Sequence, residues 1–338
     1  MIYTVTLNPA MDYNLTVHSL NRGVTGLASS AIMIPGGKGV NVSLMLHRLG
    51  LGTVPMGICA GVTGTYLLDG LRAAGLSPDF VHASPQGGPE VWTRINVKIT
   101  VVGDGEREVN VPGPTLPEGS FDTLLEKIEK RLERNDTLIL SGSVPPGAGD
   151  DAYARILDRV AGRNIRVIAD TTGPRLRAVL PYHPYLIKPN RAELEELAGA
   201  TLTDDKAIVK AARNLQRQGA GHVLVSLGGE GCLLVPSFDP AHSQADRGDG
   251  HLQGACLRMG AIAGTVHSTV GAGDAMIAGL LCGLEKGWNA DNILRLATAS
   301  AAAVAFAEEG VAVTGQDVDK LYALSAVSGK TPCLHLPY

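Results

Sequence analysis

Residues 268–275, Ser-Thr-Val-Gly-Ala-Gly-Asp-Ala, are the segment of this sequence best suited to chemistry. A Gly-x-Gly turn that opens a helix leaves backbone N–H groups unpaired, and these groups together with the helix dipole can hold a phosphate. Asp274 stands where the helix begins. A carboxylate beside a phosphate suits a general base that takes a proton from an attacking hydroxyl. The alternative is that Asp274 caps the helix and the glycines form a tight turn.

A second glycine-rich loop covers residues 35–42, Pro-Gly-Gly-Lys-Gly-Val-Asn-Val, and precedes a helical pattern that continues to Leu49. Its spacing matches neither the P-loop nor the dinucleotide-binding fingerprint. The paired glycines let a ligand approach the backbone closely. Lys38 adds a positive charge and Asn41 adds an amide that both donates and accepts. The alternative for Lys38 is an ordinary solvated lysine.

Residues 91–102 alternate between polar and apolar side chains, which predicts a strand with one polar face. Asp104-Gly105 then turns the chain into a second strand over 106–111. The polar face carries Arg94, Asn96 and Lys98. It either lies over a phosphorylated substrate or faces solvent, and for Lys98 we favour the solvent face. Asp12 is expected in a polar turn after a first strand over residues 2–7.

From about residue 120 the pattern alternates between strands and helices, which predicts a parallel sheet with helices on both faces. Ligands in such sheets bind beyond the carboxyl ends of the strands. Polar or glycine-rich clusters stand at four of these ends, at residues 141–147, 170, 188–190 and 226–231. They are expected to converge with residues 268–274. Residues 236–264 are expected to form a long loop or irregular hairpin. Helices are expected over 292–308 and 318–326, before a tail.

The amino-acid composition excludes several classes of protein. The 338 residues are 45% hydrophobic and carry a net charge of −4 without a basic block, so nucleic acid is not the expected partner. The five cysteines lack C-x-x-C spacing, which argues against disulfides and a zinc site and for a reducing compartment. No signal peptide and no apolar run long enough to span a membrane is evident. We therefore predict a cytoplasmic protein without a membrane partner.

The loops together resemble signatures of the ribokinase/PfkB carbohydrate kinase family, in family order over nearly the whole chain. The matching segments are residues 6–12, 35–41, 93–98, 141–147, 187–193 and 268–274. The resemblance implies a single α/β kinase domain over residues 1–338, Rossmann-like, with a three-layer parallel sheet and helices on both faces. It also implies a small β-sheet lid from about residues 10–35 and 88–112, and a homodimer formed through that lid.

Within the family the details resemble the phosphosugar branch of 1-phosphofructokinases and tagatose-6-phosphate kinases. The implied reaction is ATP-dependent conversion of fructose 1-phosphate to fructose 1,6-bisphosphate. Tagatose 6-phosphate and fructose 6-phosphate are alternative acceptors. A catalytically weak sugar-phosphate sensor and a nucleoside kinase are alternatives of different classes.

The resemblance also implies roles for individual residues. Asp274 is the general base, and the amides of Gly271, Ala272 and Gly273 form the anion hole. The residues implied to bind the phosphosugar are Asp12, Gly37, Lys38, Asn41, Arg94 and Ser143. Those implied to line the ATP groove are Lys188, Asn190, Ser226, Gly228, Gly231 and Ala303. Asn190 and Glu193 are implied to order Mg²⁺, with Glu193 acting through water. The carbonyls of Ser268, Val270 and Gly310 are implied donors to a monovalent cation such as K⁺.

Two positions depart from the family pattern. Residue 275 is alanine where the family usually has serine, and residues 22–28 lack the cation that relatives often carry there, unless Arg22 supplies it. The alanine should leave the backbone amides intact, so activity is expected to survive. These departures leave open a weakly active or retuned enzyme.

Overall fold

The computed structural model describes residues 1–84, 90–237, 252, 255–308, 311–327 and 334–336. They contain two sheets. The large one has the strand order β14-β13-β12-β11-β10-β9-β8-β1-β4-β5. Its parallel strands are β5 (Asp79–Ala83), β4 (Thr53–Ala60), β1 (Ile2–Thr6), β8 (Thr137–Ser141), β9 (Arg166–Asp170), β10 (Leu186–Ile187) and β11 (His222–Ser226).

Three antiparallel strands extend the large sheet beyond β11. They are β12 (Cys232–Val235), β13 (Cys256–Met259) and β14 (Leu334–Leu336). The interpretation of residues 236–264 as a loop or irregular hairpin is therefore wrong for residues 256–259, which form a regular strand, and residues 238–251 and 253–254 lie outside the described part. The expected tail is also wrong for residues 334–336, because these residues pair with β13.

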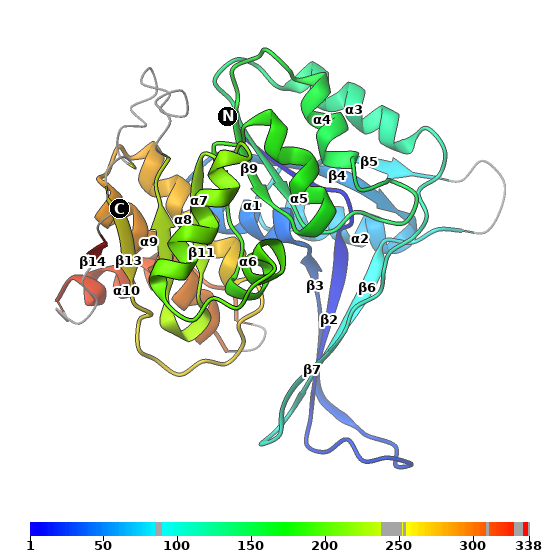
Figure 1. The fold of residues 1–338 in the computed structure, drawn as a ribbon. Coiled ribbons are helices and arrows are strands. Elements are labelled where there is room, and N and C mark those ends of the chain that lie inside the picture. The colour runs from blue at the N-terminus through cyan, green and yellow to red at the C-terminus, as the bar shows by residue number, and fades with distance from the viewer. Residues whose placement is uncertain (85–89, 238–251, 253–254, 309–310, 328–333, 337–338) are drawn as a thin grey trace.

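Helices cover both faces of the large sheet, as the alternating pattern predicts. One face carries α3 (Ser120–Arg131), α4 (Ala152–Arg159), α5 (Gly173–Val179), α6 (Arg191–Ala198) and α7 (Asp205–Arg217). The opposite face carries α1 (Lys38–Arg48), α2 (Gly61–Ala73), α8 (Ala272–Glu285), α9 (Ala290–Phe306) and α10 (Gly315–Val327). Figure 1 shows α3 and α4 above strands β4 and β5, and α1 and α2 below them. The predicted three-layer α/β fold is confirmed.

The helices pack through apolar stripes and have local signals at their ends. In α7 the buried residues Ile208, Ala211, Ala212 and Leu215 follow the i, i+3, i+4, i+7 spacing of one helix face. The Asp204 side chain caps this helix by accepting a hydrogen bond from the N–H of Ala207 at 2.7 Å. The strands between the helix layers are almost wholly buried, as in other parallel sheets with both faces covered.

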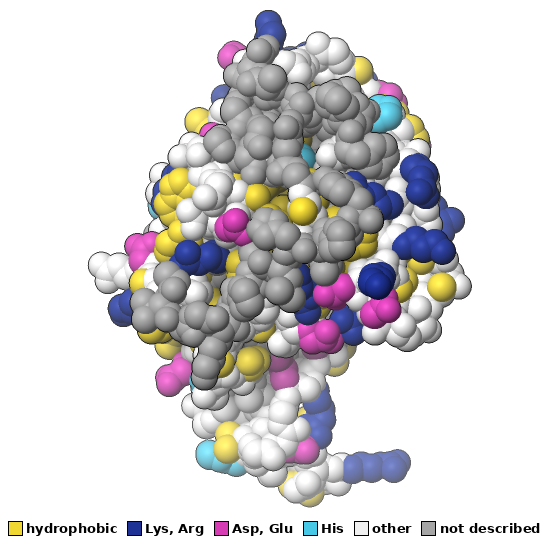
Figure 2. Space-filling model, turned by 60° about the vertical axis from the view of Figure 1, so that its left-hand side comes forward, with side chains coloured by type: hydrophobic (Ala, Val, Ile, Leu, Met, Phe, Trp, Pro, Cys, Tyr) yellow, Lys and Arg dark blue, Asp and Glu magenta, His cyan; other side chains and the backbone are white. Residues whose placement is uncertain are grey.

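A second sheet, here called the small sheet, has the strand order β3-β2-β6-β7. Its strands are β2 (Ala10–Val17), β3 (Ala28–Gly36), β6 (Arg94–Val101) and β7 (Gly105–Val109). It projects from the body as a long twisted arm (Figure 1) and forms the narrow lower end of the molecule in Figure 2. Asp12 lies within β2, so the prediction of a turn at this residue is wrong.

The small sheet brings distant residues into register. Strands β2 and β6 pair in parallel, which places Asp12 opposite Asn96 and Asn14 opposite Lys98. Arg22 lies in the exposed connection between β2 and β3, whereas the candidate site lies at the other end of the arm, and Arg22 does not line the site's cavity. The structure therefore gives Arg22 no place in the site of its own chain.

Candidate active site

A cavity of about 1050 Å³ lies at the carboxyl ends of β1, β8, β9, β10 and β11, beside the root of the small sheet. Almost all of the predicted site residues line it. They are Asp12, Gly37, Lys38, Asn41, Arg94, Ser143, Lys188, Asn190, Glu193, Ser226, Gly228, Gly231, Gly271, Ala272, Gly273 and Asp274. The strand ends and the two glycine-rich loops therefore meet as the sequence indicates, and the roles of the individual residues stay predictions.

Among the residues predicted to bind the phosphosugar or ATP, Ala303 does not line this cavity. It lies on α9 and is buried in the core, and its neighbours Ala301, Ala302 and Ala305 line the cavity instead. Successive residues of a helix point about 100° apart, so an alanine-rich segment alone does not reveal which alanines face a ligand. The helix is the predicted one, but the residue is wrong.

The turn that opens α8 has the geometry of an anion-binding nest. Gly271 is the N-cap in the left-handed region, with φ 79° and ψ −8°, which favours glycine. The N–H of Ala272 donates to the carbonyl of Thr269 at 3.2 Å, so this amide is used within the loop. The amides of Gly271 and Gly273 have no partner among the described residues. The turn can thus offer two unpaired donors to an anion.

Lys188 lies directly beside this turn. A Cβ atom added to Gly273 would stand 3.0 Å from Lys188 Nζ, so a larger residue at position 273 would push against the ammonium group. Lys188 is itself buried, with 5% of its surface exposed. The ammonium and the two free amides therefore concentrate positive potential at one point of the cavity.

Asp274 is buried at this point, with 5% of its surface exposed. Asn41, in the first turn of α1, donates from Nδ2 to Asp274 Oδ2 at 2.8 Å and fixes the carboxylate. Burial, with the negative charge of Asp170 as the second cause, raises the pKa of Asp274 to about 7, although Lys38, Asn41 and Lys188 favour its charged form. A carboxylate with this pKa can accept a proton at neutral pH and is suited to general-base chemistry.

Asp170 is a site residue to which the sequence analysis gave no role. Its carboxylate is buried at the end of β9, and Oδ1 lies 3.3 Å from Lys38 Nζ and 3.4 Å from Lys188 Nζ. Burial opposes ionisation, but the two lysines outweigh it and lower the pKa of Asp170. The available signal was its place after a predicted buried strand. Asp170 thus holds together lysines that come from α1 and from the end of β10.

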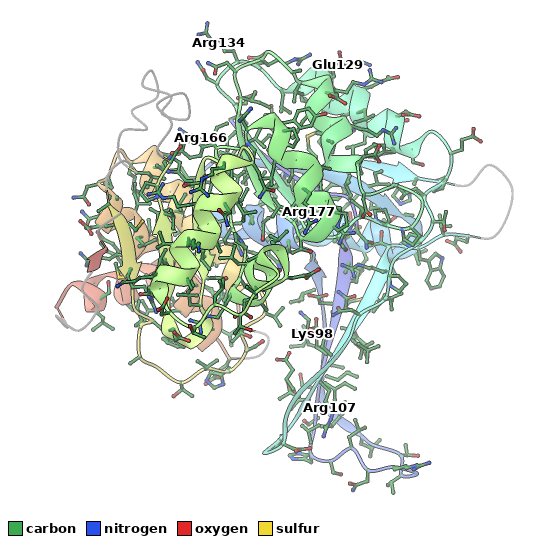
Figure 3. The ribbon with its side chains drawn as sticks, viewed as in Figure 1. Lys98, Arg107, Glu129, Arg134, Arg166 and Arg177 are labelled. Carbon is green, nitrogen blue, oxygen red and sulfur yellow. The ribbon has the colours of Figure 1, made fainter. Side chains whose placement is uncertain are left out.

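On the side of the small sheet, Asp12 forms a buried polar cluster. Asn96 Nδ2 donates to Asp12 Oδ1 at 2.9 Å, and Lys98 Nζ lies 2.8 Å from Asp12 Oδ2. Only 7% of Lys98 is exposed, so the solvent-face interpretation of Lys98 is wrong. Figure 3 shows Lys98 where the arm joins the body and Arg107 farther along it. Lys98 needs a counter-charge because it is buried, and the parallel pairing of β2 and β6 supplies Asp12.

Asp12→Ala is expected to lower the free energy of unfolding by about 3–5 kcal/mol, because it leaves Lys98 buried without its partner. Urea unfolding at pH 7 measures this change. The double variant Asp12→Ala/Lys98→Met is expected to recover most of the loss. Strict additivity of the two single substitutions would show that the pair contributes no coupling energy.

Arg94 and Ser143 are linked through Asn8. Arg94 donates from Nη1 to the carbonyl of Val111 at 2.9 Å and from Nε to the carbonyl of Asn8 at 3.3 Å. The Asn8 side chain donates to Ser143 Oγ at 3.1 Å. These contacts join β6, the loop after β1 and the loop after β8 on one wall of the cavity, where an Arg fork and a hydroxyl can both reach a phosphate.

The small sheet also touches the loop that precedes the nest. Ser268 Oγ donates to Glu106 Oε2 of β7 at 3.2 Å, and the N–H of Val270 donates to the same hydroxyl at 3.3 Å. The contact spans 162 residues of sequence. The arm therefore contacts the loop before α8, next to Thr269 and Val270, which line the cavity.

Asn190 and Glu193 form a capping box at the start of α6. Asn190 Oδ1 accepts from the N–H of Glu193 at 2.8 Å, and Glu193 Oε2 accepts from the N–H of Asn190 at 2.8 Å. These bonds fix both side chains at the cavity wall. Within the described residues no group of three or more His, Cys, Asp or Glu could hold a metal ion by itself. A metal here would need ligands from water or substrate as well.

The match to known proteins covers most of the chain. Residues 4–313 match the family described as "pfkB family carbohydrate kinase". The chain belongs to this family. As a member it is a phosphotransferase that acts on a sugar hydroxyl, and the family implies ATP and a divalent metal as its cofactors.

Two relatives and one solved structure show the extent of the likeness. A Bacillus subtilis protein named 1-phosphofructokinase is 35% identical over 309 residues, which are 91% of this chain and 94% of the relative. A Bacillus licheniformis protein named D-tagatose-1-phosphate kinase is 32% identical over 91% of this chain and 93% of its own. The structure of Escherichia coli phosphofructokinase-2 in complex with potassium is similar with a TM-score of 0.83 and 28% identity, over 96% of this chain and 99% of that one.

In this pfkB family member, Ala275 is buried in the core, and its N–H donates to the carbonyl of Gly271 at 2.9 Å. The alanine thus leaves the helix start intact, as expected. No helix in the described segments is long and apolar enough to cross a membrane.

Proposed function

We propose that this protein is an ATP-dependent kinase that converts fructose 1-phosphate to fructose 1,6-bisphosphate. The observation that carries this proposal is the buried carboxylate of Asp274, fixed by Asn41 at the nest that opens α8. The likeness to the Bacillus subtilis protein supports the choice of acceptor. Tagatose 6-phosphate and fructose 6-phosphate are the alternative acceptors, and the Bacillus licheniformis relative supports a ketose phosphate in general.

In this mechanism Asp274 accepts the proton of the acceptor hydroxyl as that oxygen attacks the γ-phosphorus of ATP. The bond between this phosphorus and the bridging oxygen of the β-phosphate breaks, and ADP leaves. The free amides of Gly271 and Gly273 and the ammonium of Lys188 stabilise the negative charge of the phosphoryl group in transfer. Asn41 keeps the carboxylate oriented toward the hydroxyl. Asp12 and Asn96 would bind sugar hydroxyls, and Arg94 with Ser143 would bind the phosphate already on the acceptor.

The residues present fit Mg²⁺ as the divalent metal. Glu193 and Asn190 each use one side-chain oxygen in the capping box, which leaves Glu193 Oε1 for a metal-bound water. Asp170 Oδ2 is buried and has no hydrogen-bond partner in the described part of the chain. Oxygen donors of this kind suit Mg²⁺, which keeps several waters and neutralises phosphate charge when bound. We propose Glu193, through water, and Asn190 as its residues.

We further propose a monovalent cation such as K⁺ beside the nest, with the carbonyls of Ser268 and Val270 as donors. The third predicted donor, Gly310, lies outside the described residues. The potassium complex of the Escherichia coli structure supports this proposal. Equal rates in potassium and tetramethylammonium salts at the same ionic strength would rule it out.

The small sheet is proposed to act as a lid over the acceptor, within a single kinase domain of residues 1–338, because its root carries Asp12, Asn96 and Arg94. Lid closure would exclude water and limit ATP hydrolysis.

The arm also exposes apolar side chains, among them Leu27 at 84% and Val109 at 58%, and Figure 2 shows hydrophobic side chains at this narrow end. We propose that they form a homodimer interface. A monomer in sedimentation equilibrium at assay concentration would contradict it.

We propose a cytoplasmic location because the described cysteines are not in disulfide bonds. Cys59, Cys232, Cys256 and Cys282 are buried free thiols, as expected in a reducing compartment.

The acceptor is tested by coupled measurement of ADP release with Mg²⁺ and ATP. Fructose 1-phosphate, fructose 6-phosphate and tagatose 6-phosphate are compared side by side, with fructose and adenosine as unphosphorylated controls. The proposal expects the highest kcat/KM with fructose 1-phosphate and little turnover of the controls. A higher value with either 6-phosphate would keep the mechanism and replace the acceptor. Turnover of adenosine alone would overturn the proposal.

A further inference from the structure

Arg175 is a charged residue of the cavity that has no role in the mechanism above. It lies in the first turn of α5 and lines the cavity with Thr171 and Thr172. Its Nη1 lies 3.2 Å from Asp150 Oδ1, and 57% of the Asp150 side chain is exposed. Its Nε is buried and has no hydrogen-bond partner among the described residues. Because ion pairs with exposed carboxylates are weak, the guanidinium is loosely held and has an unused donor.

The position of Arg175 complements that of the nest. Leu176 and Val179 of α5 pack in the core on one face of the large sheet, whereas α8 packs on the opposite face. Arg175 and the turn at 271–273 therefore approach the strand ends from opposite sides. Between them, at the end of β9, lies Asp170 with its two lysines. An anion bound at the strand ends could thus be reached from both faces.

The charge balance of the cavity also indicates that Arg175 is available to bind an anion. Lys38 and Lys188 share Asp170, and Lys98 is paired with Asp12. Arg94 donates to two backbone carbonyls. A nucleotide and a phosphosugar together bring several negative charges into the cavity. A further cation that can leave its carboxylate partner and bind a phosphate would help to neutralise them. The planar fork of arginine matches phosphate oxygens in pairs.

We propose that Arg175 is a phosphate-binding residue of this cleft. In the ternary complex its guanidinium exchanges Asp150 for oxygens of a substrate phosphate, on the side of the cavity opposite to the nest. The group that Arg175 binds is a phosphate dianion, which belongs either to the acceptor sugar or to the nucleotide. The inference rests on the proposed function, and its test includes binding measurements that need no turnover.

The test compares Arg175→Ala, Arg175→Lys and two controls in the full chain. Calorimetry gives Kd for fructose 1-phosphate and for a non-hydrolysable ATP analogue with Mg²⁺, and steady-state assays give kcat and KM. Arg175→Ala is expected to lower kcat/KM by about 10- to 100-fold, the range for a lost hydrogen bond to a charged group. Arg175→Lys keeps the charge but not the fork and is expected to lie between. Added guanidinium ion is expected to restore part of the loss in Arg175→Ala.

The effect of Arg175→Ala on each binding constant and on kcat shows which substrate supplies the phosphate. Weaker binding of fructose 1-phosphate assigns Arg175 to the acceptor, whereas weaker binding of the ATP analogue, or a loss confined to kcat, assigns it to the nucleotide. The controls are Arg177→Ala, an exposed arginine of the same helix that Figure 3 labels, and Asp150→Asn, which removes the resting partner. Both controls are expected to stay within about 3-fold of wild type, since Arg177 is exposed and the pair between Asp150 and Arg175 is a weak surface contact.

Two results would overturn the inference. One is that Arg175→Ala matches Arg177→Ala in both binding constants and in kcat/KM. The other is that Asp150→Asn loses as much as Arg175→Ala, which would mean that the ion pair only supports the structure. If wild type binds both ligands but transfers no phosphoryl group, the proposed function fails, and the binding constants still decide the role of Arg175.

Discussion

Asp274→Asn is expected to lower kcat by roughly 10²- to 10⁴-fold, the usual contribution of a positioned general base. The amide keeps the size of the carboxylate and can still accept the hydrogen bond from Asn41. It cannot take the proton of the acceptor hydroxyl. Binding of fructose 1-phosphate and of an ATP analogue is therefore expected to stay within a few-fold of wild type. Rapid-quench measurement of the chemical step and calorimetry of both ligands check the two halves of this result.

The matched control is Ala275→Ser, at the next residue of α8. It alters the start of the helix without touching the carboxylate, and its rate is expected to stay close to that of wild type. A rate for Asp274→Asn within tenfold of wild type would remove Asp274 from the mechanism. Loss of ligand binding in Asp274→Asn would instead make the residue a structural part of the site.

The same substitution has an expected effect on stability. The pKa of Asp274 is about 7 in the folded protein and near 4 in an unfolded chain, so the folded state retains a proton that the unfolded state releases in this window. Stability of the wild type therefore falls as pH rises from about 4 to 7. Asparagine does not titrate. The stability advantage of Asp274→Asn over wild type is expected to grow by roughly 2–3 kcal/mol between pH 5 and pH 8, which urea unfolding at the two pH values measures.

Asp170→Asn is expected to have the second large effect, and it acts on both pH dependence and stability. The negative charge of Asp170 raises the pKa of Asp274, whereas Lys38 and Lys188 lower it. Without Asp170, burial still raises the pKa of Asp274, but no neighbouring negative charge adds to it, so the two lysines bring this pKa down. The acidic limb of the profile of kcat/KM against pH, expected near pH 7 in wild type, should move to lower pH by about one unit or more.

The stability change in Asp170→Asn follows from the same contacts. Lys188 is buried and loses the carboxylate of Asp170 as its counter-charge, so the free energy of unfolding at pH 7 is expected to drop by roughly 3–5 kcal/mol. The matched control is Asp69→Asn, which breaks a solvent-exposed pair with Arg72 and is expected to change stability by less than about 1 kcal/mol. An unmoved pH profile in Asp170→Asn would show that Asp170 does not tune Asp274.

The sequence predicted the general layout of the site because that layout depends on local patterns. The carboxyl ends of parallel strands must share one edge of a sheet, so clusters after predicted strands, such as Ser143 and Lys188, could be placed together. The glycine-rich turns before Lys38 and Ala272 signalled two helix starts, and both helices begin at these residues.

The features that were missed depend on contacts between distant segments. Lys98 looked like a solvent-facing lysine because Asp12, its partner, is 86 residues away and is aligned only by the pairing of β2 with β6. Asp170 matters because it lies between two lysines of other elements. Ala303 was misplaced since composition does not fix the rotation of a helix. Strand β14 was read as a tail because a three-residue strand has almost no local signal.

The most direct test of the central claim is a single-turnover experiment with wild type, Mg²⁺, fructose 1-phosphate and ATP labelled in its γ-phosphate. We predict that the label appears in fructose 1,6-bisphosphate, and that Asp274→Asn transfers it at least 100-fold more slowly, the lower end of a general-base contribution. Label that stays in ATP, or that appears only as inorganic phosphate, would show that this protein is not a fructose 1-phosphate kinase.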